Sequence, residues 1–334
     1  MNEVKETINK IINLRDSKHS NSLHVPSGLW KKWLEKLGFV RELSEKSLRE
    51  IRLYVGMGFF IGAPWSKAYY QANEIKLQLM QPSDSSYIKD YLRLTKNIPE
   101  NLKLTELDPT RNEIAIEFNG KYITEDVLRV QSTISNLNNF PKFKSCIEIG
   151  GGYGALANQV IKVYEVEKYT IIDYPEMLFF VAIWSKVVNP KLKIVIYDGS
   201  NKSELDNAEL ALVPNFLYKS IQIEGDLLIN ENSFCEMSQA QVLDYLQAKN
   251  LNYNYMYSNN RDRQFMNRDL PEGINSLLER YFQLSPSVQE YKEYYKDSSL
   301  KNKWNQKNIF YASKNELLNI DINLINGLSI RTEH

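Results

Sequence analysis

Four glycines within five positions, directly after a short apolar run, constrain this chain most. The stretch from Cys146 to Gly154 reads CIEIGGGYG, and the 334-residue chain has only 14 glycines, so the cluster marks a site rather than a glycine-rich composition. This pattern predicts a buried strand that ends in a tight turn and opens a helix. Because glycine has no Cβ atom, such a turn lets a ligand lie against the backbone itself.

Composition excludes several classes of partner. Lys and Arg total 41 and balance 41 Asp and Glu, so we expect no nucleic-acid partner and no bulk attraction to an anionic membrane. The two cysteines, Cys146 and Cys235, lie in apolar surroundings and cannot form a disulfide framework, and no Cys/His cluster has zinc spacing. Neither a signal sequence nor an apolar stretch of membrane-span length is visible. We therefore expect a soluble, cytoplasmic protein; the sequence indicates no metal ligands and leaves a metal-assisted reaction open.

Residues 1–140 are expected to form a mainly helical region. Helical spacing of apolar residues and turn signals place helices at 3–14, 28–55 and 123–137, the last capped by Thr124, and a hairpin at 114–123 around Asn119-Gly120. Residues 56–65 read as a loop rich in glycine and aromatic residues, suited to a lid or a pocket wall. This region would supply substrate walls, and a homodimer interface is a second role for it.

Residues 141–334 show a different sequence pattern, in which short apolar segments expected to form strands alternate with segments expected to form helices. The expected strands are 145–149, 169–173, 193–197, 226–230 and 254–257, with two later candidates near 281–284 and 309–312. The expected helices between them are 155–164, 177–188 and 238–249, the last capped by Ser238. Such alternation predicts an α/β fold with a doubly wound, Rossmann-like parallel sheet that is covered on both faces.

Acidic residues stand in or after the first three expected strands. Glu148 lies inside the first, Asp173 ends the second, and Asp198-Gly199 ends the third. In an open parallel sheet, ligands bind outside the carboxyl ends of the strands. A carboxylate after the second strand can accept both ribose hydroxyls, and the next one along can accept the amine of an adenine. The series predicts a nucleoside that lies across this edge.

Two cofactors with a nucleoside compete for this site. The spacing Gly150-x-Gly152-x-x-Ala155 also fits the dinucleotide fingerprint, so an NAD(P)-dependent oxidoreductase is one alternative. However, Glu148 precedes the turn by two residues, and a carboxylate there disfavours a pyrophosphate. A ligand with a cationic amino or sulfonium group, namely S-adenosyl-L-methionine, would tolerate it. A non-catalytic binding subunit of the same fold is the third alternative.

The motifs resemble those of class I S-adenosylmethionine-dependent methyltransferases over residues 145–258. Glu148–Gly154 matches the first motif of that class, and Ile171–Pro175 is similar to the DLP motif of its O-methyltransferase branch, with Tyr174 in place of leucine. Ile229–Met237, which reads INENSFCEM, resembles a segment of the sugar O-methyltransferase family. The helix segment Glu125–Arg129 also resembles that family, whereas the first 110 residues match it loosely.

The resemblance implies a methyltransferase that transfers the methyl group of S-adenosyl-L-methionine to a sugar hydroxyl. The sugar would belong to a glycan, a nucleotide-sugar or a natural product, as in polysaccharide biosynthesis. The cofactor-binding residues expected from the motifs and strand ends are Glu148, Gly150, Gly151, Gly152, Tyr153, Gly154, Asp173, Tyr174, Asp198, Gly199 and Asn230.

A hydroxyl acceptor needs a general base, because it is a poor nucleophile while protonated. Related O-methyltransferases often use a histidine after the fourth strand, but this chain has no histidine between His24 and His334. Glu236 is the first candidate for the base, and His24 is the second. Ser233 and Arg129 are the candidates for substrate binding, the latter through a phosphate or carboxylate.

Overall fold

The computed structural model describes most of the chain. The described residues are 2–20, 22–26, 28–38, 42, 84–107, 115–138, 140–260, 274–279, 281–283, 308–313 and 328–331. The expected loop at 56–65 and the later part of the helix expected at 28–55 lie outside them.

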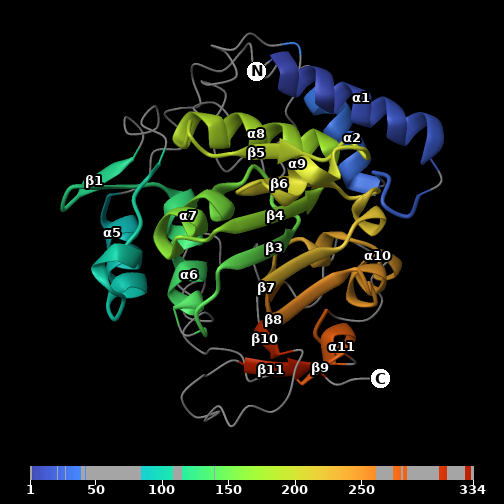
Figure 1. Cartoon of the computed structure of the whole chain (residues 1–334). Coiled ribbons are helices and arrows are strands. Elements are labelled where there is room, and N and C mark those ends of the chain that lie inside the picture. The colour runs from blue at the N-terminus through green and yellow to red at the C-terminus, as the bar shows by residue number, and fades with distance from the viewer. Residues whose placement is uncertain are drawn as a thin grey trace.

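One sheet organises the described part of the chain, with the strand order β5-β6-β4-β3-β7-β8-β10-β11-β9 (Figure 1). The strands from β5 to β8 are parallel, and β10 runs antiparallel to β8. Their bounds are β3 Ser145–Ile149, β4 Lys168–Asp173, β5 Ile194–Ile196, β6 Leu210–Pro214, β7 Ile223–Glu231, β8 Leu251–Asn260, β9 Phe282–Gln283, β10 Asn308–Ser313 and β11 Leu328–Arg331. The doubly wound parallel sheet expected from the sequence is confirmed.

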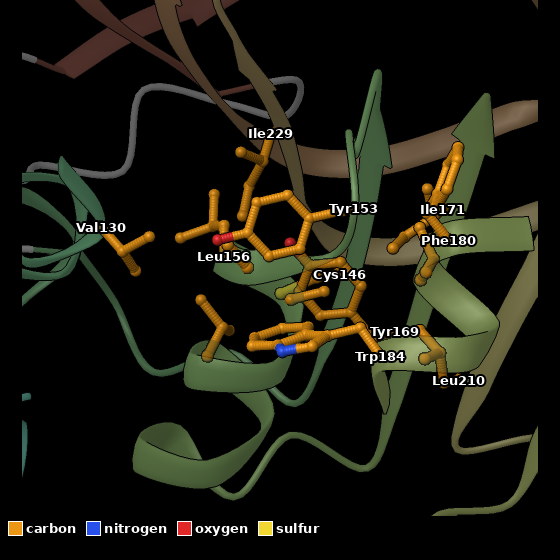
Figure 2. Packing of buried hydrophobic residues seen from close by; sticks show 14 of the residues in the cluster. Val130, Cys146, Tyr153, Leu156, Tyr169, Ile171, Phe180, Trp184, Leu210 and Ile229 are labelled. Carbon is orange, nitrogen blue, oxygen red and sulfur yellow. The ribbon is translucent and has the colours of Figure 1, made fainter. Parts of the chain in front are cut away.

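Helices cover both faces of this sheet, as alternating strands and helices require. One hydrophobic cluster lies under α6 (Glu125–Leu137), α7 (Ala155–Tyr164) and α8 (Pro175–Val188). Figure 2 shows part of it, with Tyr153 packed edge-on against Trp184 at a centroid distance of 5.1 Å. A second cluster lies on the opposite face, under α9 (Lys202–Asp206), α10 (Gln239–Leu246) and α11 (Ile274–Glu279).

Local signals set the element boundaries that the sequence predicted. Asn119 and Gly120 both have positive φ, at 51° and 73°, so the turn between β1 (Ile116–Phe118) and β2 (Lys121–Ile123) is the expected hairpin turn. Thr124 caps α6 by accepting a hydrogen bond from the Val127 amide. Ser238 caps α10 and forms a capping box with Gln241.

Strand β6 is the largest departure from the sequence-based expectation. It lies between β4 and β5, so the strand that ends near Asp198 is not the neighbour of the strand that ends at Asp173. The prediction that these two carboxylates follow adjacent strands is therefore wrong. The position beside Asp173 belongs instead to Asn215, which directly follows β6.

The N-terminal helices share the core of the sheet. Helix α1 (Asn2–Lys18) packs along α8, α2 is Gly28–Leu37, and α5 (Asp84–Thr95) packs on α6 (Figure 1). A single buried cluster contains side chains from α1 through β8. No helix of the described residues is long and apolar enough to cross a membrane.

Candidate functional site

The glycine turn after β3 needs its glycines for two separate reasons. Gly150, Gly152 and Gly154 have φ values of 79°, 59° and 85°, a region that side chains with a Cβ atom rarely adopt. In addition, a Cβ atom at Gly150 would collide with the hydroxyl of Ser233, which follows β7. The turn and the loop after β7 are therefore packed directly together at the carboxyl edge of the sheet.

Asp173 lies against this turn, as the sequence predicted. One of its carboxylate oxygens accepts a hydrogen bond from the Gly152 amide at 3.1 Å, and the other accepts one from its neighbour Tyr174 at 2.7 Å. Burial, with the charges of Glu176 and Glu236, raises the pKa of Asp173 to about 7, although the two amide hydrogen bonds oppose the shift. The turn and the acid after β4 thus form one unit.

Asp198 has a local role in the structure. One of its oxygens accepts hydrogen bonds from the Ser200 amide, the Ser200 hydroxyl and the Asn201 amide at 2.8–3.2 Å. Burial acts to raise the pKa of Asp198, but these hydrogen bonds outweigh it and lower the pKa. The carboxylate is exposed and closes the turn at Gly199, whose φ is 96°, two strands away from Asp173.

Asn215 occupies the strand end beside Asp173. Its amide donates to the Asp173 carbonyl at 2.9 Å, and its side-chain nitrogen donates to the His24 carbonyl at 3.0 Å. Its side-chain oxygen is buried and has no hydrogen-bond partner. A buried acceptor without a donor is costly, and a ligand N–H would satisfy it. Sequence analysis missed Asn215 because it missed the preceding strand.

Glu148 is enclosed beneath the turn. Its carboxyl group accepts a hydrogen bond from the Tyr169 hydroxyl of β4 at 2.9 Å, and the residue is 2% exposed. Burial raises the pKa of Glu148 to about 8, and the charges of Glu231 and Asp173 add to the effect. Glu148 is therefore mostly protonated at neutral pH. A positive charge close to the carboxyl group would favour its ionised form.

This assignment predicts how stability changes with pH. Because the folded-state pKa of Glu148 lies above its unfolded value, the carboxyl stabilises the fold below about pH 4, and this contribution is lost as pH rises through about 8. In Glu148→Gln we expect the free energy of unfolding to depend less on pH, since glutamine cannot ionise but still accepts a hydrogen bond from Tyr169. Urea denaturation between pH 5 and 8 measures this free energy. If it changed with pH equally in both proteins, the assignment would be contradicted.

Arg129 of α6 lies between two buried carboxylates, Asp126 of the same helix and Glu231 at the end of β7. Its guanidinium is 3.9 Å from Asp126 and 3.8 Å from Glu231. Tyr153 of the glycine turn donates to Asp126 at 2.6 Å, and Thr133 donates to Glu231 at 2.7 Å. Burial raises the pKa of Glu231 even though Arg129 and Thr133 oppose it. Glu231 was not among the site residues expected from the sequence, although its place at the end of a strand was an available signal.

The loop after β7 is held by Asn230. The Asn230 side chain is fully buried, donates to the Ile149 carbonyl at 2.8 Å and accepts from the Phe234 amide at 3.0 Å. It therefore ties the turn after β3 to the loop that carries Ser233. Glu236 ends the short 3₁₀ helix η8 (Phe234–Glu236) of this loop and accepts a hydrogen bond from the Trp30 indole at 3.2 Å.

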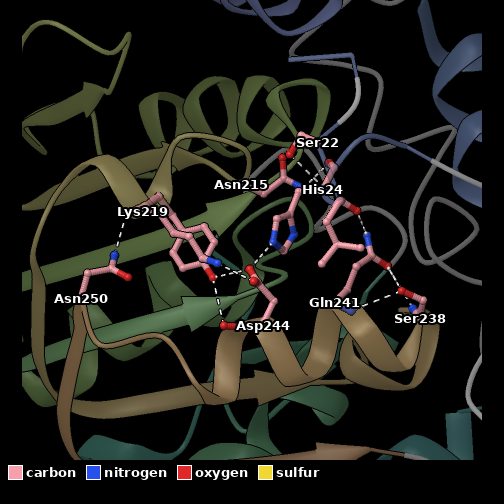
Figure 3. A network of polar contacts seen from close by, with 10 residues as sticks. Ser22, His24, Asn215, Lys219, Ser238, Gln241, Asp244 and Asn250 are labelled. Carbon is pink, nitrogen blue, oxygen red and sulfur yellow. Dashed lines mark hydrogen bonds and ion pairs between the residues drawn. The ribbon is translucent and has the colours of Figure 1, made fainter.

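His24 belongs to a polar network on α10 rather than to the turn (Figure 3). Its Nε2 atom lies 2.8 Å from the Asp244 carboxylate, which also accepts from Tyr218 and pairs with Lys219. Burial lowers the pKa of His24, and Asp244 opposes this shift. The imidazole is therefore bonded to α10 and not to the glycine turn. The backbone carbonyl of His24 contacts the sheet edge, where it accepts a hydrogen bond from Asn215.

Metal-binding groups were also sought in the described residues. They contain no set of three or more His, Cys, Asp and Glu side chains arranged to hold a metal ion.

No family model matches this chain, and no curated protein matches its sequence. Among solved structures, a pyocyanin biosynthetic protein shares 13% identity with a TM-score of 0.33, and the match covers 85% of this chain and 90% of that one. A phosphoethanolamine N-methyltransferase of Haemonchus contortus, solved with S-adenosyl-L-methionine, shares 12% identity with a TM-score of 0.34 over 66% of this chain and 47% of that one. These identities and TM-scores are too low to assign a function to this chain.

Proposed function

We propose that the chain is an S-adenosyl-L-methionine-dependent O-methyltransferase. The observation that carries the proposal is the unit formed by the glycine turn and Asp173 at the carboxyl edge of a parallel sheet, with the unsatisfied oxygen of Asn215 beside it. An acceptor for ribose hydroxyls and an acceptor for an amine are thus adjacent, which fits an adenosine group. A pyrophosphate is less suited, because the buried carboxyl group of Glu148 beneath the turn would ionise favourably only beside a positive charge, which a pyrophosphate lacks.

Different residues of the site would bind different parts of the cofactor. Asp173 would accept the ribose hydroxyls, Asn215 would accept the adenine amine, and the glycine turn would let the ligand approach the backbone. Glu148 would ionise as the positively charged end of the cofactor enters, since an opposite charge nearby favours its charged form. The cofactor itself supplies the activated methyl group.

We further propose that the acceptor is a sugar hydroxyl and that Glu236 removes its proton. The proposal of a sugar is supported by the resemblance of the segment Ile229–Met237, and that of Glu236 by its position after β7, close enough to Asp173 for their charges to interact. The protein must align the hydroxyl with the methyl group, which supplies much of the rate enhancement in such displacements. The contacts of Arg129 with Asp126 and Glu231 support the proposal of a neutral acceptor over a phosphorylated one.

Calorimetric titration with S-adenosylhomocysteine and, separately, with NADH tests the class. We expect saturable binding of S-adenosylhomocysteine alone, whereas saturable binding of NADH alone would replace the proposal with an oxidoreductase. Transfer of a labelled methyl group to a panel of sugars then tests the acceptor. Tight cofactor binding without transfer to any sugar, glycan, amine or phenol would indicate a non-catalytic subunit.

The Asp173→Asn variant tests the ribose contact. Leaving ligand hydroxyls without a charged acceptor costs about 1–3 kcal/mol, so we expect a roughly 10- to 100-fold weaker affinity for S-adenosylhomocysteine. Because the carboxylate must be ionised, wild-type affinity should fall as pH drops through about 7, and this dependence should be weaker in the variant. The exposed Asp206→Asn on α9 is the control. Equal affinities of all three proteins would remove Asp173 from the site.

A further inference from the structure

The N-terminal segment (residues 2–38, as far as they are described) crosses the edge of the sheet where the candidate site lies. Helix α1 lies on α8, on one face of the sheet, whereas the His24 ring contacts the rings of Tyr218 and Tyr245 on the other face. At the edge itself, the backbone carbonyl of His24 accepts a hydrogen bond from Asn215, which follows β6. The segment then continues into α2, whose Trp30 reaches residues that follow β4 and β7.

Trp30 contacts two sides of the site at once. Its indole nitrogen donates a hydrogen bond to Glu236 Oε2 at 3.2 Å, and its ring lies 5.9 Å from the ring of Tyr174, the residue after Asp173. The backbone of Glu236 is fixed independently, because its amide donates to the Ser233 carbonyl at 2.9 Å. The indole therefore acts on the carboxylate and not on the course of the loop.

The segment is anchored firmly enough to place this donor accurately. Arg15 of α1 forms a buried ion pair with Glu176 of α8 at 2.9 Å. Gln241 of α10 donates to the Leu23 carbonyl at 3.0 Å, and His24 is bonded to Asp244 (Figure 3). A side chain that orients a reacting group is effective when its own supports are rigid, and the chain is held at Arg15, Leu23 and His24, just before the helix that carries Trp30.

We propose that Trp30 is a positioning residue for Glu236, so that the N-terminal segment completes the catalytic site. The inference rests on the proposed function, in which Glu236 is the base. A glutamate side chain has three rotatable bonds, and the indole N–H would fix the orientation of the Glu236 carboxylate relative to the acceptor hydroxyl. A donor to the carboxylate also favours its ionised form, which is the form that can take a proton.

The test is the Trp30→Phe variant, which keeps an aromatic ring beside Tyr174 and removes only the donor. We expect kcat at pH 7 to fall about tenfold, and the acid limb of the pH–rate profile to move up by about one pH unit, because the carboxylate loses one hydrogen-bond donor. The KM for the acceptor and the affinity for S-adenosylhomocysteine should stay close to wild type. Lys31→Ala, an exposed neighbour on α2, is the matched control.

A second readout separates this inference from the proposed function. The carboxyl carbon of Glu236 is followed by NMR through a pH titration, with Glu236→Gln to identify its signal, and this needs no turnover. A titration midpoint unchanged in Trp30→Phe would overturn the inference. A shifted midpoint with an unmoved acid limb would overturn it as well, since Trp30 would then act on a carboxylate that does not limit the reaction. Absence of S-adenosylhomocysteine binding in the wild type would instead refute the proposed function.

Discussion

We expect the Arg15→Ala substitution to lower the free energy of unfolding by about 3–5 kcal/mol. The guanidinium of Arg15 and the carboxylate of Glu176 meet at 2.9 Å, and their side chains are only 8% and 7% exposed. Removal of the arginine leaves a carboxylate buried between α1 and α8 without its cation, and such an uncompensated charge costs several kcal/mol. Urea denaturation of the two proteins measures the loss.

The double variant Arg15→Leu/Glu176→Leu separates the charge effect from packing. Replacing a whole buried ion pair with apolar residues is often neutral, so most of the lost stability should return. Arg93→Ala is the surface control, because the pair of Arg93 with Asp90 is partly exposed and such pairs contribute about 0–1 kcal/mol. A double variant as unstable as Arg15→Ala would show that the cost lies in packing rather than in the unpaired charge.

The second large effect is expected in Glu236→Gln. General-base catalysis contributes typically about 10²- to 10⁴-fold, so we expect kcat for methyl transfer to fall by that factor. Glutamine is isosteric and still accepts the hydrogen bond from Trp30, and the η8 turn is fixed by backbone contacts. Cofactor affinity and the free energy of unfolding should therefore stay unchanged. Labelled-methyl transfer and calorimetry measure the two properties.

The control for this variant is Glu204→Gln, an exposed carboxylate on α9. Wild-type turnover in Glu236→Gln would exclude Glu236 as the base. The next candidate would then be Glu231, the last residue of β7, whose pKa is raised by burial. The same two measurements on the Glu231→Gln variant would test it.

The parts of the site that follow from local sequence were predictable. The glycine turn requires positive φ angles, and glycine is the residue that adopts them readily, so the cluster at 150–154 located the turn directly. Asp173 was located because it ends an apolar run, and parallel strands end at the same edge. The hairpin at Asn119-Gly120 and the caps at Thr124 and Ser238 follow in the same way from the conformational preferences of those residues.

The parts that depend on distant contacts were not predictable. Strand β6 is a five-residue buried run with no alternating pattern, and nothing local indicates that it inserts between β4 and β5. Because this strand was not predicted, Asp198 was expected as the second acceptor, and Asn215, which we propose for that role, was not a candidate. Likewise, the contact between Trp30 and Glu236 joins residues 206 positions apart, and that between Arg15 and Glu176 joins residues 161 apart. Periodicity along the chain contains no information on either pair.

These separations also determine the order in which the molecule can assemble. Arg15, His24 and Trp30 leave the ribosome well before their partners Glu176, Asp244 and Glu236. Until those partners have been translated and the sheet has formed, the first helix has nowhere to dock and its apolar face stays exposed. Closure of the N-terminal segment over the sheet must therefore be a late event in biosynthesis, and the candidate site at the sheet edge is complete only then.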